Sequence, residues 1–389
     1  MTTTTTVPNL AGVQGQNPLK GLLAYGQSPW LDYIRRNILL NGDLKKMIDN
    51  DGLRGMTSNP AIFEKAITAG DDYNDIIKAT DAKSSTAMAL YEQIAIRDVQ
   101  HAADIFGPVH KETKGRDGYV SLEVSPNLAF DTQATIDEAR RLWQAVNRPN
   151  VMIKIPATPQ GVPAIRQALE EGININITLL FAQSAYEEVA EAYLSALEAR
   201  AAKGQDISHI ASVASFFVSR IDSLVDSTID AKLKTETDSP KKSLLESLRG
   251  KVAIANARRT YAKYQELFGG ARWKALAAKG GQTQRLLWAS TSTKNPKYRD
   301  VLYVEELIGA DTVDTIPPAT FDAFREHGRL RNSLTENVAG ADKTMSDLEA
   351  AGISMTDITN KLLNDAVKLF QDPFKQLLDA IAKHAGVRA

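Results

Sequence analysis

The chain has 389 residues, of which 46 are basic and 47 acidic, with a net charge of −1 and no cysteine. The balanced charge without a basic block gives no nucleic-acid footprint, and the lack of cysteine excludes disulfides, thiolate catalysis and cysteine-based metal sites. The N-terminus lacks the basic and apolar regions of a secretory signal, and no apolar run reaches the roughly 18 residues that span a bilayer. We therefore expect a soluble, cytoplasmic protein without a membrane or nucleic-acid partner.

The first 20 residues are rich in Thr, Gly and Gln and are predicted to form an irregular arm. Between residues 21 and 320, short apolar runs alternate with helical patterns. Strands that alternate with helices are typical of parallel βαβ units, and eight in succession predict a closed (β/α)8 TIM barrel rather than an open sheet. The eight predicted strands are Pro29–Tyr33, Gly55–Thr57, Tyr119–Val124, Val151–Ile155, Ile173–Leu179, Ile210–Phe217, Arg285–Ala289 and Thr312–Thr315.

Three regions exceed the minimal strand-helix unit. Helical insertions are predicted at about 59–118 and 226–281, and a C-terminal helical tail over 321–389. The second insertion contains a charged helix pair at Lys241–Lys251 and Ile254–Leu267.

The tail has an apolar face, and we expect it to pack on the barrel. It would either cover the barrel mouth or lie on the barrel flank. The residues of this face are Phe370, Pro373, Phe374, Leu377 and Leu378.

The run Val151–Pro156 places Lys154 in the middle of an apolar, β-branched segment. A strand that is apolar on both faces belongs inside a parallel sheet, where an ammonium ion is costly to bury. A neutral amine is a nucleophile toward carbonyls, so Lys154 is a candidate Schiff-base residue. The alternative is a structural lysine at a strand end that reaches solvent or forms an ion pair.

Further polar residues lie within or directly after the predicted strands. In a barrel, the C-terminal ends of the strands carry the active site. Strand alternation places Glu123 and Lys154 opposite their apolar neighbours, facing the interior. Buried polar groups need hydrogen-bond partners, so these side chains must either bond to one another or bind a ligand. The candidates are Asp32, Asn59, Glu123, Lys154, Asn176, Thr178, Ser215, Arg220 and Ser290.

Four segments, in order along the chain, resemble motifs of the transaldolase family, which is related to the class I aldolases. They are Thr57–Pro60, Val151–Pro156, Asn176–Phe181 and Ser215–Arg220. Two more segments, Gln27–Asp32 and Trp288–Thr291, resemble the longer bacterial branch of that family. The resemblance extends from about Asn17 to about Phe370, and four motifs in order on one barrel are far more specific than any one of them.

The resemblance implies an enzyme of the pentose phosphate pathway that needs no cofactor or metal. It would transfer a dihydroxyacetone unit from sedoheptulose 7-phosphate to glyceraldehyde 3-phosphate, giving erythrose 4-phosphate and fructose 6-phosphate. Lys154 would form the Schiff base, and Asp32 would take the proton from the C4 hydroxyl as the C3–C4 bond breaks. Glu123 and Thr178 would hold a water that shuttles protons.

The resemblance also implies a set of substrate-binding residues. Asparagines would hydrogen-bond the sugar hydroxyls, and an arginine and a serine would grip the phosphate, because the planar guanidinium matches phosphate oxygens. These residues are Asn59, Asn176, Ser215, Arg220 and Ser290.

The chain departs from the family pattern at Ser292, where some transaldolases have a second phosphate-binding arginine. Lys294 lies two residues further on and is predicted to supply the charge as a point cation. Phe216 also stands where some relatives have proline.

Structural roles remain open for several candidates. Asp32 would otherwise pair with Arg35 or Arg36, Glu123 would pair with Lys154, and Asn59 would shape a turn before Pro60. In the same way, Thr178 would be an ordinary strand residue, and Arg220 would form a surface ion pair. The five histidines share no spacing and are not predicted to bind metal.

Two other functions compete with transaldolase. An aldolase would release dihydroxyacetone to water, although known aldolases of that kind are shorter chains. A phosphosugar-binding barrel without turnover would have lost one of Lys154, Asp32 and Glu123, all of which are present. A monomer and a homodimer are both compatible with the sequence.

Overall fold

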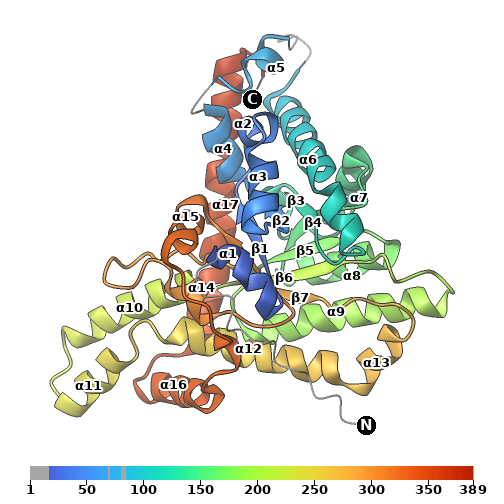
Figure 1. Ribbon diagram of the computed structural model, residues 1–389. Helices are drawn as coiled ribbons and strands as arrows, with labels where there is room; N and C mark the ends of the chain where they lie inside the picture. Colours follow the sequence, from blue (N-terminus) through green and yellow to red (C-terminus); the bar gives the residue numbers. More distant parts are fainter. Residues whose placement is uncertain (1–16, 69–70, 80–84, 389) are drawn as a thin grey trace.

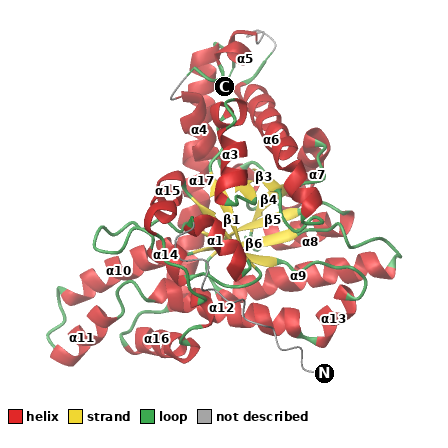
Figure 2. Cartoon of the chain, viewed as in Figure 1, coloured by secondary structure: helices red, strands yellow, loops and turns green. Residues whose placement is uncertain are grey.

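The computed structural model describes residues 17–68, 71–79 and 85–388. Eight parallel strands close into a barrel in chain order, with β8 hydrogen-bonded to β1. Helices surround the barrel on all sides (Figure 2). The strands are β1 Gln27–Asp32, β2 Gly55–Thr57, β3 Tyr119–Glu123, β4 Val151–Pro156, β5 Ile175–Leu180, β6 Ser212–Phe217, β7 Arg285–Ala289 and β8 Thr312–Ile316.

The predicted (β/α)8 barrel is therefore confirmed, and each predicted strand overlaps an observed one. The largest shifts, of two residues each, are at strand starts: β1 begins at Gln27 instead of Pro29, β5 at Ile175 instead of Ile173, and β6 at Ser212 instead of Ile210. Side chains explain the first shift, because Gln27 Nε2 donates to the carbonyl of Leu307 at 2.6 Å and so fixes the start of β1 beside β8.

The register of the strands assembles the polar residues in one layer. Glu123 on β3 is the neighbour of Lys154 on β4, and Lys154 is the neighbour of Asn176 on β5. Because side chains alternate along each strand, three polar residues at one register level all face the barrel interior.

Seventeen α-helices are described (Figure 1). They are α1 Pro18–Gly21, α2 Arg36–Leu40, α3 Asp43–Asp51, α4 Pro60–Thr68, α5 Asn74–Ala79, α6 Ala87–Glu112, α7 Thr132–Val146, α8 Gly161–Glu171, α9 Gln183–Ala202, α10 Ser219–Leu233, α11 Ser239–Ser247, α12 Val252–Gly269, α13 Ala271–Ala277, α14 Leu302–Glu306, α15 Pro318–His327, α16 Val338–Ala350 and α17 Met355–Ala385.

Several segments differ from the sequence-based prediction. Residues 1–16 lie outside the described residues, and the predicted irregular arm ends early, because Asn17 caps helix α1 through a bond from the amide of Leu19. The charged helix pair corresponds to α11 and α12, but α11 ends at Ser247 rather than Lys251. Gly250 has a φ of +65°, a left-handed conformation that ends helices.

The barrel interior is filled below the mouth by aromatic rings. Trp30 is fully buried, and its ring centroid lies 6.5 Å from that of Tyr119. A Cβ atom at Gly55 would lie only 2.4 Å from the Trp30 ring, so β2 needs glycine at this position. On β1 the indole lies between Ser28 and Asp32, on the same inward face of the strand.

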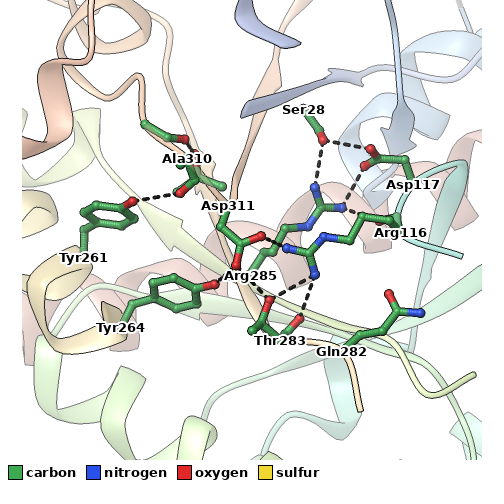
Figure 3. Close-up of polar contacts among 12 residues, drawn as sticks. Ser28, Arg116, Asp117, Tyr261, Tyr264, Gln282, Thr283, Arg285, Ala310 and Asp311 are labelled. Atoms are coloured by element: carbon green, nitrogen blue, oxygen red, sulfur yellow. Dashed lines mark hydrogen bonds and ion pairs between the residues drawn. The ribbon is translucent and has the colours of Figure 1, made fainter. Parts of the chain in front are cut away.

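The bottom of the barrel is closed by a network of ion pairs and hydrogen bonds (Figure 3). Arg285 on β7 forms an ion pair with Asp117 at 2.7 Å, and both side chains are more than 90% buried. The guanidinium also donates to Ser28 Oγ at 2.7 Å. Arg116 forms an ion pair with Asp311 and donates to Thr283 Oγ1 at 3.0 Å. The network ties loops at the bottom of the barrel to β1 and β7.

The C-terminal tail begins within α15, which spans the predicted boundary at residue 321. Its last helix, α17, has 31 residues and packs against α4, α6 and α10, with further contacts to β5. Figure 1 shows it as the long red helix beside α4 and α5. No helix among the described residues is both long and apolar enough to cross a membrane.

Candidate active site

A cavity of about 170 Å³ opens at the C-terminal ends of the strands. Eight of its lining residues, Lys294 among them, were predicted from the sequence as site residues. Two other selected residues contact lining residues directly: Glu123 bonds Lys154, and Asn176 bonds Ser215. The lining comprises Asp32, Thr57, Asn59, Lys154, Thr178, Ser215, Phe217, Arg220, Ala289, Ser290, Ser292, Lys294, Thr315, Pro317 and Phe370.

Lys154 and Glu123 form a buried ion pair. Lys154 Nζ lies 3.2 Å from Glu123 Oε2, and only 6% of each side chain is exposed. The amine also donates to the carbonyl of Ser58 at 3.3 Å. Burial raises the pKa of Glu123, although the charge of Lys154 opposes that rise. A carboxyl whose pKa lies closer to neutrality can exchange protons with the adjacent amine. The lysine is thus held by one acid and one carbonyl, and it faces the cavity.

Asp32 ends β1 and is held by hydroxyl groups rather than by arginine. Asp32 Oδ1 accepts a hydrogen bond from Thr57 Oγ1 at 2.8 Å, and Thr57 Oγ1 lies 2.7 Å from Thr315 Oγ1. The alternative partners are engaged elsewhere, because Arg35 pairs with Asp72 and Arg36 with Asp98. Burial raises the pKa of Asp32, and the nearby charge of Lys154 opposes this rise.

Two lining strands end in a strained backbone. Leu179 has a φ of +64° and Ser290 a φ of +57°, values that non-glycine residues rarely adopt. The first coincides with an irregularity in the register of β5 and β6 between Ile177 and Leu180. Backbone strain of this kind clusters at functional sites. Here it follows Thr178 directly and includes Ser290, so it fixes two predicted site residues.

The Thr178 hydroxyl is buried, and its Oγ1 has no hydrogen-bond partner among the described residues. Buried hydroxyl groups are normally satisfied by protein or by water. Because Thr178 also lines the cavity, its oxygen is available to a bound molecule.

Two cations lie on one side of the cavity. Arg220 follows β6, and its carbon Cζ lies 5.5 Å from the centroid of the Phe217 ring. Its buried Nη1 finds no acceptor in the part of the chain that the structure describes. Lys294 donates to Ser292 Oγ at 2.7 Å. Burial lowers the pKa of both groups, so the site would gain from a bound anion.

The two asparagines are partly engaged by the protein. Asn59 Oδ1 accepts from the amide of Ile62 at 3.0 Å, which leaves its NH₂ group toward other partners. Asn176 donates to Ser121 Oγ at 2.9 Å and accepts from Ser215 Oγ at 2.6 Å. Asn59 therefore shapes the start of α4, as the structural alternative proposed, and lines the cavity as well.

Six lining residues were not predicted from the sequence as site residues: Thr57, Phe217, Ala289, Ser292, Thr315 and Pro317. Thr57 and Phe217 carried a usable signal, because both end a predicted strand on its inward face. Phe370 was predicted only as part of an apolar face, and the structure places it in the lining at the mouth. Among the described residues, no group of three or more His, Asp or Glu side chains is placed to hold a metal ion.

Comparisons with known proteins agree with this geometry. The family model described as Transaldolase/Fructose-6-phosphate aldolase matches residues 29–381. A protein of Trichodesmium erythraeum named Transaldolase is 50% identical to the chain over 92% of this chain and 94% of that protein. Transaldolase 2 of a Nostoc species is 46% identical over 94% and 97% of the two chains. Transaldolase of Thermobifida fusca is 44% identical over 94% and 98%.

Proposed function

Since the chain belongs to the transaldolase/fructose-6-phosphate aldolase family and is a transaldolase, we propose that it carries a dihydroxyacetone unit between phosphosugars as a Schiff base on Lys154. The donor is sedoheptulose 7-phosphate and the acceptor glyceraldehyde 3-phosphate, with erythrose 4-phosphate and fructose 6-phosphate as products. The buried ion pair of Glu123 with Lys154, which lines the cavity, is the observation that carries this proposal.

The first stage is formation of the iminium. Lys154 Nζ, as the free amine, adds to the C2 carbonyl carbon of the ketose, and the resulting carbinolamine loses water. The oxygen must be protonated before it leaves. Glu123 is suited to supply this proton, because its Oε2 lies 3.2 Å from Nζ and burial raises its pKa. The unpartnered hydroxyl of Thr178 is suited to hold the water that relays the proton.

The second stage is cleavage of the C3–C4 bond. Asp32 takes the proton of the C4 hydroxyl, the C3–C4 electron pair moves toward the iminium nitrogen, and an aldose phosphate leaves. The enamine that remains on Lys154 adds to the carbonyl of the acceptor, whose oxygen takes the proton back from Asp32. Water then hydrolyses the iminium and restores the amine. The raised pKa of Asp32 brings this base closer to the pH at which it works.

The phosphate of the substrate is assigned to the cationic side of the cavity. Arg220 offers a planar guanidinium with a free Nη1, and Ser290 and Lys294 lie on the loop that follows β7. A bound phosphate would offset the burial that lowers the pKa of Arg220 and Lys294.

Borohydride trapping tests the proposal. Fructose 6-phosphate is added with sodium borohydride, which reduces an iminium to a stable secondary amine, and the intact mass and the modified peptide are determined. We expect a dihydroxyacetone-sized adduct on Lys154 that is absent from Lys154→Met. The control variant Lys343→Met removes an exposed lysine and should be labelled like the wild type. A folded, substrate-binding wild type without any adduct would exclude the Schiff base.

A further inference from the structure

The C-terminal helix brings an aromatic ring over the reactive lysine. Phe370 on α17 lines the cavity, and its ring centroid lies 5.7 Å from Lys154 Nζ. The two residues are far apart in the chain, and strand β4 and helix α17 meet here only through the fold. The distance is within the range in which a ring face attracts a cation.

Neighbouring residues of the helix fix the position of this ring. Phe374, one turn further along α17, is 2% exposed, and its ring packs edge-on against Tyr91 with centroids 5.4 Å apart. Gln371 donates to the carbonyl of Pro126 at 3.4 Å. Pro126 follows β3, the strand that ends at Glu123. The helix is therefore anchored beside Glu123, and Phe370 is held rather than free.

Leu369, the residue directly before Phe370, points away from the cavity. Leu369 is 56% exposed, one of the few large apolar side chains left in solvent among the described residues. Adjacent helix residues point about 100° apart, so α17 directs one apolar side chain to the cavity and its neighbour to water.

We propose that Phe370 covers the three-carbon unit on Lys154 and so determines whether that unit is transferred or released. This inference rests on the Schiff base proposed above. Release requires that the enamine carbon takes up a proton and that one water adds to the resulting iminium, which frees dihydroxyacetone and restores the amine. Transfer requires the same carbon to bond to an aldehyde. A ring that keeps water from the enamine favours the second route.

The experiment measures the partition between the two routes in one reaction. Full-length wild type and Phe370→Ala are given fructose 6-phosphate with a fixed amount of erythrose 4-phosphate. Free dihydroxyacetone and sedoheptulose 7-phosphate are quantified by chromatography. The ratio of release to transfer does not depend on the folded fraction, because unfolded protein contributes to neither product.

We expect Phe370→Ala to raise the ratio about tenfold or more, because the site is opened to water. Phe370→Leu keeps an apolar cover and should restore most of the wild-type ratio. Leu369→Ala, on the exposed side of the same helix, should leave the ratio unchanged.

Two results separate this inference from the proposed function. A ratio that is the same in Phe370→Ala and wild type, with trapping on Lys154 intact in both, overturns the role of Phe370 alone. Absence of trapping in the wild type overturns the Schiff base and the inference with it.

Discussion

Both ends of the barrel contain buried charged and hydroxyl side chains. Those of the bottom network are paired with one another, whereas some of those at the mouth are unpaired. At the bottom, Arg285 is matched by Asp117, Ser28 and the carbonyl of Arg116, and Arg116 is matched by Asp311 and Thr283 (Figure 3). At the mouth, Lys154 has a carboxylate, but Thr178 Oγ1 and Arg220 Nη1 have no partner among the described residues.

This difference separates a structural network from a binding site. Buried polar groups are stabilising only when they are satisfied, so the bottom network can hold the barrel closed by itself. Unsatisfied groups of the mouth cost stability in the free protein and recover it when a ligand supplies the missing partners. Composition alone does not distinguish the Arg285–Asp117 network from the mouth; the partners of its charged groups do.

The largest expected effect is on catalysis at the mouth. Lys154→Met should lower kcat/KM by about 10⁴-fold or more, because the nucleophile is lost. The unfolding free energy should change little, since Glu123, whose pKa is already raised by burial, can take up a proton when its partner is removed. Steady-state kinetics and urea unfolding measure the two quantities. A variant that unfolds readily would place Lys154 with the structural networks.

At the bottom of the barrel we expect a large loss of stability with little change in activity. Arg285→Met leaves Asp117 buried without its cation and should lower the unfolding free energy by about 3–5 kcal/mol. The activity per folded molecule should stay close to that of the wild type. Arg141→Met, which removes the surface ion pairs of Arg141 with Glu92 and Glu138, is the matched control and should cost under about 1 kcal/mol. A large loss of kcat in folded Arg285→Met would contradict the division between the two ends.

Removal of the phosphate cation should have an intermediate effect. Arg220→Ala is expected to cost about 2–3 kcal/mol of substrate binding, which is roughly 30- to 150-fold in KM. Lys294→Ala should have a smaller effect, because a point cation lacks the planar fork of arginine. The comparison of fructose 6-phosphate with fructose isolates the phosphate. Equal losses for both sugars would show that Arg220 does not bind the phosphate.

Asp314 on β8 provides a smaller, pH-dependent test. It is buried like Asp117, but its Oδ1 accepts only from Thr291 Oγ1, and Oδ2 has no partner in the described ranges. Burial raises the pKa of Asp314 to about 8. The folded state thus keeps a proton that the unfolded state has already lost above about pH 4, and stability falls as the pH rises from about 4 to 8.

The variant Asp314→Asn removes this dependence. Relative to the wild type, it should gain about 2 kcal/mol of unfolding free energy between pH 6 and pH 8. Urea unfolding of both proteins at the two pH values gives the difference, in which the titration of all other groups cancels. A difference that is independent of pH would show that Asp314 is ionised in the folded protein.

Much of the barrel and its mouth could be predicted from the sequence, because local patterns determine them. Eight short apolar runs with helical patterns between them gave the closed barrel. The period of two along each strand placed Glu123 and Lys154 on the inward face, where the register makes them neighbours. The alternation of side chains along a strand is sufficient when a prediction depends only on which face of the strand a residue occupies.

The remainder depends on contacts between distant segments. The left-handed conformation of Leu179 follows from the register of β5 against β6, and nothing in its own sequence indicates it. The hydrogen bonds of Asn176 to two serines depend on three strands at once. Phe370 could be predicted to lie on an apolar face, but the choice between mouth and flank depends on where α17 packs.

The position of Phe370 also has a consequence for biosynthesis. Asp32, Lys154 and Lys294 all leave the ribosome before α17 does, and N-terminal parts of a chain generally fold first. A barrel that closes on the ribosome therefore has its nucleophile in place while the residue above it is still being translated. Messages that end early, or tags that disturb the last helix, would yield barrels whose lysine is open to cellular aldehydes and ketones.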